Sequence, residues 1–124
     1  MNPGHGMGNT GVPFGCPEQV RNLLKITAFE VHQPDPLHPK RPVLGLECPK
    51  PEMSGRRIWS FLAQRYGSVH LISQKIYIVN HCPLWMFNHA GKNITPDKLT
   101  GSATQGLKLI CNDHLLKIVK AMGI

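Results

Sequence analysis

The sequence has no apolar run long enough to span a bilayer, and its start lacks both the charged region and the hydrophobic core of a signal peptide. It is also poor in acidic side chains, with seven Asp and Glu against 14 Lys and Arg, for a formal net charge of +7. We therefore expect no membrane as a partner for a spanning segment. The positive charge predicts an acidic partner, for which nucleic acid ranks before an anionic membrane surface. Charge alone leaves open a basic protein with no such partner.

The cysteines, Cys16, Cys48, Cys82 and Cys111, include no close pair. This spacing lacks the paired ligands of structural zinc and the framework of a disulfide-rich protein, so reduced thiols are expected. His81 beside Cys82 has no second ligand pair at a suitable spacing, and we expect no metal site. The glycine-rich start lacks the Gly-Lys-Ser/Thr ending of a phosphate-binding loop and the leading strand of a dinucleotide-binding fold.

Length and composition predict one domain over residues 1–124, with 41% hydrophobic residues and a modest core. Residues 1–16 are predicted to form an irregular glycine-rich loop. Residues 33–42 hold four prolines and are predicted to form a surface loop. Residues 43–46 and the β-branched residues 76–79 are predicted strands, the second of them buried.

Four helix signals accompany these strands. Pro17 suits a first helical turn, and Ser54 is a candidate cap for a helix that Gly67 ends. Thr95 followed by proline and an acid is a third helix start. Residues 105–122 carry the clearest apolar stripe. Strands alternating with helices predict an α/β layered fold.

Two asparagines lie beside residues that bend the backbone, Asn2 before Pro-Gly and Asn80 before His-Cys-Pro. A side-chain amide can hold a water molecule or read the edge of a base, but it is no strong nucleophile. Phe14, between proline and glycine, suits a ring presented for stacking. The structural alternatives are an Asx turn at Asn2, a core position for Phe14 and a strand-end cap at Asn80. Together, Asn2, Asn80 and Phe14 suggest a pocket for an extruded base.

Several short motifs in one order resemble the single-strand-selective monofunctional uracil-DNA glycosylases. They are Asn-Pro-Gly at 2–4, Gly-Val-Pro-Phe-Gly at 11–15, the twelve residues 38–49, Ser-Gly at 54–55, Asn-His-Cys-Pro at 80–83, and Gly-Lys-Asn with Thr-Pro within 91–96.

The resemblance implies a three-layer α/β/α sandwich of the uracil-DNA glycosylase type that needs no cofactor. It implies a nuclear, monomeric DNA repair enzyme that flips uracil or oxidised uracil out of single- or double-stranded DNA and hydrolyses the N-glycosidic bond. In this reading Asn2 holds the water, Asn80 pairs with uracil, and Phe14 stacks on it. Met1 and Gly4 bring backbone close to the base.

The resemblance also implies a DNA-contacting segment that includes Gly91, Lys92, Asn93 and Thr95. Relatives carry a strand before the motif that begins at Met1, and a His-Pro-Ser-Pro motif beyond the position of Ile124. We therefore expect an incomplete sandwich, without the first strand and the C-terminal part, that alone has little activity. The alternative is a catalytically inactive fragment that only binds nucleic acid.

Overall fold

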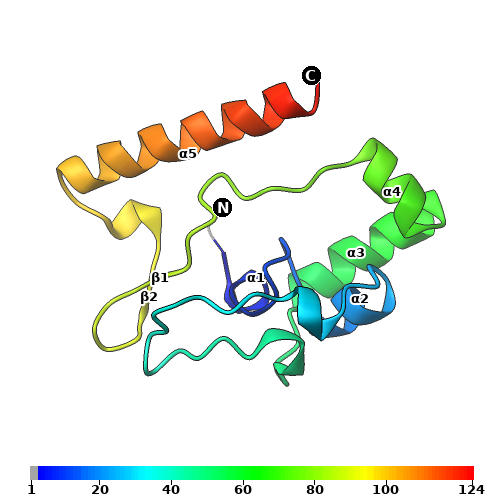
Figure 1. The fold of residues 1–124 in the computed structure, drawn as a ribbon, viewed down its shortest axis with the longest axis horizontal. Helices are drawn as coiled ribbons and strands as arrows, with labels where there is room; N and C mark the ends of the chain where they lie inside the picture. The colour runs from blue at the N-terminus through cyan, green and yellow to red at the C-terminus, as the bar shows by residue number, and fades with distance from the viewer. Residues whose placement is uncertain (1–2) are drawn as a thin grey trace. The chain divides into compact units, whose positions relative to one another are not determined.

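The computed structural model describes residues 3–124, which divide into two compact units, Pro3–Ile78 and Val79–Ile124. Helices make up most of the regular structure, and one small antiparallel sheet accompanies them (Figure 1). This mixture of helix and sheet is compatible with the predicted α/β class.

The glycine-rich start of the chain forms helix α1 (His5–Thr10), so the prediction of an irregular loop there is wrong. The Gly8 N–H donates to the Gly4 carbonyl oxygen at 2.9 Å, which closes the first turn. The Asn9 side chain donates to the His5 carbonyl oxygen at 2.8 Å. Helix α1 also packs against its neighbours in the unit. These contacts outweigh the low helix propensity of glycine.

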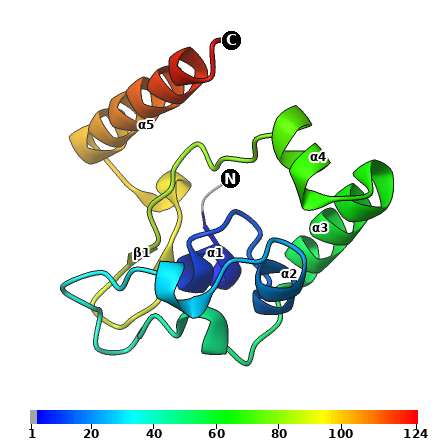
Figure 2. The same cartoon turned by 45° about the vertical axis from the view of Figure 1, so that its right-hand side comes forward.

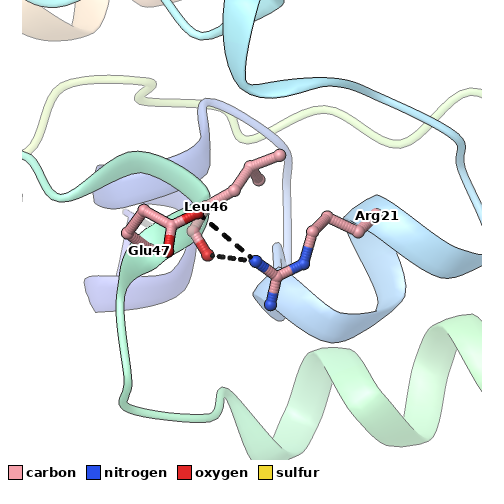
Figure 3. A network of polar contacts seen from close by, with 3 residues as sticks. All are labelled: Arg21, Leu46 and Glu47. Atoms are coloured by element: carbon pink, nitrogen blue, oxygen red, sulfur yellow. Dashed lines mark hydrogen bonds and ion pairs between the residues drawn. The ribbon is translucent and has the colours of Figure 1, made fainter.

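Helix α2 (Pro17–Asn22) has proline in its first turn, as predicted. Arg21 from this helix donates to the Leu46 carbonyl oxygen at 3.1 Å and forms an ion pair with Glu47 at 3.6 Å (Figure 3). Because the two charged side chains are exposed, the ion pair adds little stability. The bond to the backbone of Leu46, itself buried, is what ties α2 to this segment.

Residues 43–46 do not form the predicted strand. The 3₁₀ helix η2 (Gly45–Glu47) takes the last two residues of this stretch, and the Leu44 N–H donates to the side chain of Asn9. The Leu44 N–H that a strand would pair is thus used by Asn9, and the Leu44 and Gly45 carbonyl oxygens accept from the Glu47 and Cys48 N–H groups of the 3₁₀ turn. The preceding residues 33–42 lie largely outside regular structure, as predicted, after the 3₁₀ helix η1 (Ala28–Glu30).

Helices α3 (Met53–Tyr66) and α4 (Val69–Lys75) carry the hydrophobic core of this unit, and Figure 2 shows α2 beside α3. Its buried residues are Trp59, Leu62 and Ile72. The α3 cap is Glu52, whose carboxylate accepts from the Gly55 N–H, and not Ser54 as predicted. Gly67, with φ of 79°, ends the helix as predicted. Phe61 lies between the core residues Trp59 and Leu62 along α3, but it is 62% exposed and does not belong to the buried face of this helix.

Residues 76–79 are not the predicted buried strand, and helix α4, which ends directly before them, was not predicted. The backbone at Ile76 is extended, and Ile76 and Ile78 pack against the core cluster. No strand within residues 3–124 pairs with them. The β-branched residues therefore marked an extended, partly buried segment without a ladder partner.

The second unit contains a short hairpin and a long helix. Strands β1 (Met86–Phe87) and β2 (Asn93–Ile94) pair antiparallel, with Met86 opposite Ile94. The 3₁₀ helix η3 (Pro96–Lys98) has proline in its first turn as predicted but is a single turn, and α5 (Ser102–Ala121) confirms the fourth helix signal. In the apolar stripe of residues 105–122, Cys111 is buried, Ile110 and Met122 are exposed, and the other members are half-buried. None of the helices described within residues 3–124 has the length and apolar character to cross a bilayer.

Candidate active site

The Phe14 loop, residues 12–15, joins α1 to α2 and has an unusual backbone. Phe14 is half-buried and has φ of 53°, in the left-handed region that bulky residues avoid. Such a conformation costs about 1–3 kcal/mol and persists only where neighbouring contacts enforce it. Lys25 also has a positive φ of 60°, but it follows the end of α2, where this conformation commonly stops a helix. The conformation of Phe14 has no such explanation.

Two hydrogen bonds hold the backbone on either side of the Phe14 residue, besides the one from the Val12 N–H to the Thr10 hydroxyl oxygen at 3.2 Å. The Trp59 indole Nε1–H donates to the Pro13 carbonyl oxygen at 3.2 Å. The Cys16 N–H donates to the Phe14 carbonyl oxygen at 2.9 Å, which closes a tight turn over Gly15. The loop is therefore hydrogen-bonded at Pro13 and at Phe14, which fixes the backbone that carries the Phe14 side chain.

Gly4 precedes α1 with an extended backbone, and it is exposed. A Cβ added there would have open space around it. A ligand can therefore approach this backbone closely, as the prediction for Gly4 requires. The predicted catalytic Asn2 and the predicted base contact Met1 lie outside the described residues.

Asn80 belongs to the second unit and is 8% exposed. The segment before Asn80 is extended but is not a strand, so the prediction that Asn80 lies at the carboxyl end of a strand is wrong. Two contacts hold the next residues against α5. His81 Nε2 donates to the Asn112 Oδ1 atom at 2.7 Å. Cys82 contacts Cys111, and burial, together with the hydrogen bond that the Cys111 thiol donates to Cys82, raises the pKa of Cys111. Asn80 thus starts a well-anchored turn.

The hairpin turn after β1 is organised by Asn88, which sequence reasoning missed. Its side-chain oxygen accepts from the Ala90 N–H at 3.0 Å and the Lys92 N–H at 2.9 Å. Gly91 has φ of 76° and donates to the Asn88 carbonyl oxygen at 2.8 Å. An asparagine before a glycine-containing turn is a usable signal for this arrangement. Lys92 is exposed on this turn.

The remaining predicted DNA contacts lie just beyond the turn. Asn93 is in β2, and its buried Oδ1 atom has no hydrogen-bond partner among the described residues. Thr95 precedes η3, which is only three residues long, and does not cap it with its side chain. A hydrogen bond from the Thr95 side chain instead lowers the pKa of Asp97. The structure thus brings Gly91, Lys92, Asn93 and Thr95 together on one hairpin arm.

A cavity of about 460 Å³ lies elsewhere in the first unit. Its lining includes Asn9, Thr10, Glu30 and His32, whereas Phe14 and Gly4 do not line it. The cavity therefore does not coincide with the predicted base-binding residues. Within residues 3–124 no group of three or more His, Cys, Asp or Glu side chains could hold a metal ion, and the four cysteines are free thiols.

No family model matches the chain. Three curated proteins do match it over its whole length, each named as a single-strand-selective monofunctional uracil-DNA glycosylase. The identity over 125 residues is 41% to the Bos taurus protein, 42% to the Rattus norvegicus protein and 41% to the Mus musculus protein. The chain spans 46%, 45% and 44% of their respective lengths. From its first residue to its last, this chain is thus similar to just under half of a single-strand-selective monofunctional uracil-DNA glycosylase.

Proposed function

We propose that this chain supplies base recognition and hydrolysis in a DNA repair glycosylase that removes uracil or oxidised uracil from DNA. The full domain would be a three-layer α/β/α sandwich that acts as a monomer in the nucleus, on single- and double-stranded DNA. The observation that carries the proposal is the Phe14 loop, whose strained backbone is bonded to Trp59 and to Cys16. The similarity to proteins named for this activity supports it.

The chemistry assigns each amide a separate task. Hydrolysis breaks the bond between C1′ and the base nitrogen and forms a bond from C1′ to a water oxygen. Positive charge grows on the sugar and negative charge on the departing base, and the proton that the water loses ends on the base, which leaves as neutral uracil. The Asn2 side-chain oxygen accepts a hydrogen bond from this water and orients it. Its amide needs no ionised form for this task.

Base recognition falls to Asn80 and Phe14. The Asn80 amide accepts from the uracil N3–H and donates to O4, where part of the negative charge collects. Stacking on an aromatic ring is worth about 1–3 kcal/mol per base. Gly4 and Met1 approach the base through the backbone, and Lys92, with Gly91, Asn93 and Thr95, contacts the DNA strand.

The test is uracil excision by a chimera in which this chain replaces the matching residues of the Bos taurus protein. We expect excision of uracil from single-stranded DNA, and a fall of at least about 10²-fold for Asn2→Ala, since a misplaced reactant costs that much. DNA binding should change little. Asn22→Ala, an exposed position, is the matched control. A folded chimera that binds DNA but leaves uracil in place would favour a nucleic-acid-binding protein without catalysis.

A further inference from the structure

Helix α3 contacts the Phe14 loop at closer range than a side chain permits. Gly55 lies in the first turn of α3, and a Cβ at this position would collide with the Phe14 carbonyl oxygen. It would also lie 2.6 Å from the Phe14 carbonyl carbon, well inside van der Waals contact. Gly55 is therefore what lets the helix reach the backbone of Phe14.

One helical turn further along α3, Trp59 holds the neighbouring peptide. Residues four apart share a helix face, so Gly55 and Trp59 both face the Phe14 loop. The Trp59 ring is 7% exposed and packs with Leu62 and Ile72, which fixes its position. Its N–H then bonds the Pro13 carbonyl oxygen. The Phe14 carbonyl thus contacts the first turn of α3 at Gly55, and the Pro13 carbonyl accepts a hydrogen bond from Trp59 on the next turn.

The other side of the Phe14 loop is equally close to its neighbours. A Cβ at Gly15 would collide with the Thr10 hydroxyl oxygen and lie 2.7 Å from the Val12 carbonyl oxygen. The Thr10 hydroxyl is itself fixed by its bond to the Gly6 carbonyl oxygen at 2.9 Å. The loop is therefore in close contact with α1 through Gly15 and with α3 through the Phe14 carbonyl.

We propose that Trp59 and Gly55 are positioning residues that orient the Phe14 ring for a flipped base before the DNA arrives. The inference rests on the proposed function, since it assigns a use to the stacking role of Phe14. The contacts on both sides explain why a phenylalanine keeps a positive φ. A ring oriented in advance loses little freedom on binding, so its stacking contributes more fully to affinity.

The first experiment is run on the chimera and compares two DNA ligands, one with uracil and one with a tetrahydrofuran abasic site. Trp59→Phe keeps an aromatic core residue and removes the N–H donor. We expect it to weaken binding of uracil DNA by about 2- to 10-fold, the range for one hydrogen bond, and to leave abasic DNA binding unchanged. Trp85→Phe, which alters a tryptophan in edge-to-face contact with Phe87, is the matched control.

A double-mutant cycle tests whether Trp59 acts through Phe14. In a Phe14→Ala background the effect of Trp59→Phe on uracil DNA should vanish. A persistent effect, or an equal loss for both DNA ligands, would mean that Trp59 is merely structural and would overturn the inference. Absence of any uracil preference in the folded, unsubstituted chimera would instead refute the proposed function.

A second measurement needs no activity. The Cys16 N–H bonds to the Phe14 carbonyl oxygen, so its hydrogen exchange in the chain reports the loop conformation. We expect faster exchange for Gly55→Ala and for Trp59→Phe. Gly106→Ala, where an added Cβ meets no neighbour, is the control and should leave this exchange unchanged. Unaltered Cys16 exchange in both variants would overturn the positioning role, whatever the binding data show.

Discussion

Asn9 and Leu44 are 35 residues apart in the sequence and are joined by a hydrogen bond of 2.7 Å from the Leu44 N–H to the Asn9 Oδ1 atom. The other end of the same amide donates to the His5 carbonyl oxygen at 2.8 Å. Asn9 is only 5% exposed. One buried side chain therefore links α1 to the segment that leads into η2, and both of its polar ends are satisfied.

Asn9→Ala should destabilise the chain by about 1–3 kcal/mol, because it removes both hydrogen bonds of a side chain that is buried in the folded chain. The measurement is the midpoint and slope of urea unfolding. Asn22→Ala, at an exposed position, should change the free energy of unfolding by less than about 0.5 kcal/mol. Equal midpoints for the two variants would show that the Asn9 bonds carry no net stability.

Asn80→Asp should weaken discrimination between uracil and cytosine in the chimera. An ionised aspartate accepts from the N4 amine of cytosine, but it cannot donate to O4 of uracil. The measurement is the ratio of kcat/KM for uracil and cytosine in matched single strands. Asn22→Asp adds the same charge at an exposed site and should keep the original ratio. An unchanged ratio for Asn80→Asp would remove Asn80 from base recognition.

DNA affinity should fall as salt rises, and Lys92→Ala should reduce the slope of log affinity against log salt by about 1. The reason is that an exposed lysine on the hairpin turn releases one counterion when it contacts a phosphate. Lys117 is already paired with Asp113 at 2.6 Å, so Lys117→Ala should leave the slope near its original value. Identical slopes for the two variants would exclude a phosphate contact by Lys92.

The carboxyl of Glu30 should titrate below its ordinary value of 4.5. The Thr27 N–H at 2.5 Å and the Thr27 hydroxyl at 2.8 Å both donate to it, and the backbone bond lowers the pKa more. Because the folded pKa is depressed, the η1 turn keeps this stabilisation above pH 4.5 and loses it as pH falls through the folded value. Thr27→Ala should raise the pKa only in part, since the backbone donor remains.

Carboxyl carbon shifts of Glu30 followed by NMR across the acid range provide the measurement. Thr100→Ala, at an exposed position away from η1, should leave the Glu30 titration unchanged. A Glu30 pKa at or above the ordinary value would contradict the hydrogen bonding described for this turn.

Sequence patterns located helix ends better than strands. Pro17 and Gly67 act through their own backbone preferences, and these predictions are confirmed. The strands predicted at 43–46 and 76–79 depend on a partner segment, and such pairing is not encoded in the segment itself. The α1 helix was missed for the converse reason, because Asn9 holds it through a contact made far along the chain.

The candidate site was predicted in the same uneven way. The motif around Phe14 pointed to a presented ring, and the structure places it in a strained loop. Its supports, Gly55 and Trp59, could not be found by motif, since the contact is between a helix face and a backbone carbonyl. Asn88 was overlooked, although its place before a glycine-containing turn was a usable signal.

Because most of the cysteines are buried, the reactivity of their thiols measures how far the protein has unfolded. Cys16, Cys82 and Cys111 are at most 3% exposed, whereas Cys48 is partly open to solvent. A thiol reagent therefore meets one accessible sulfur in the folded chain and four in the unfolded chain. Cys16 reports on the first compact unit, and Cys82 with Cys111 reports on the second. The order in which the hidden sulfurs become labelled shows which unit opens first.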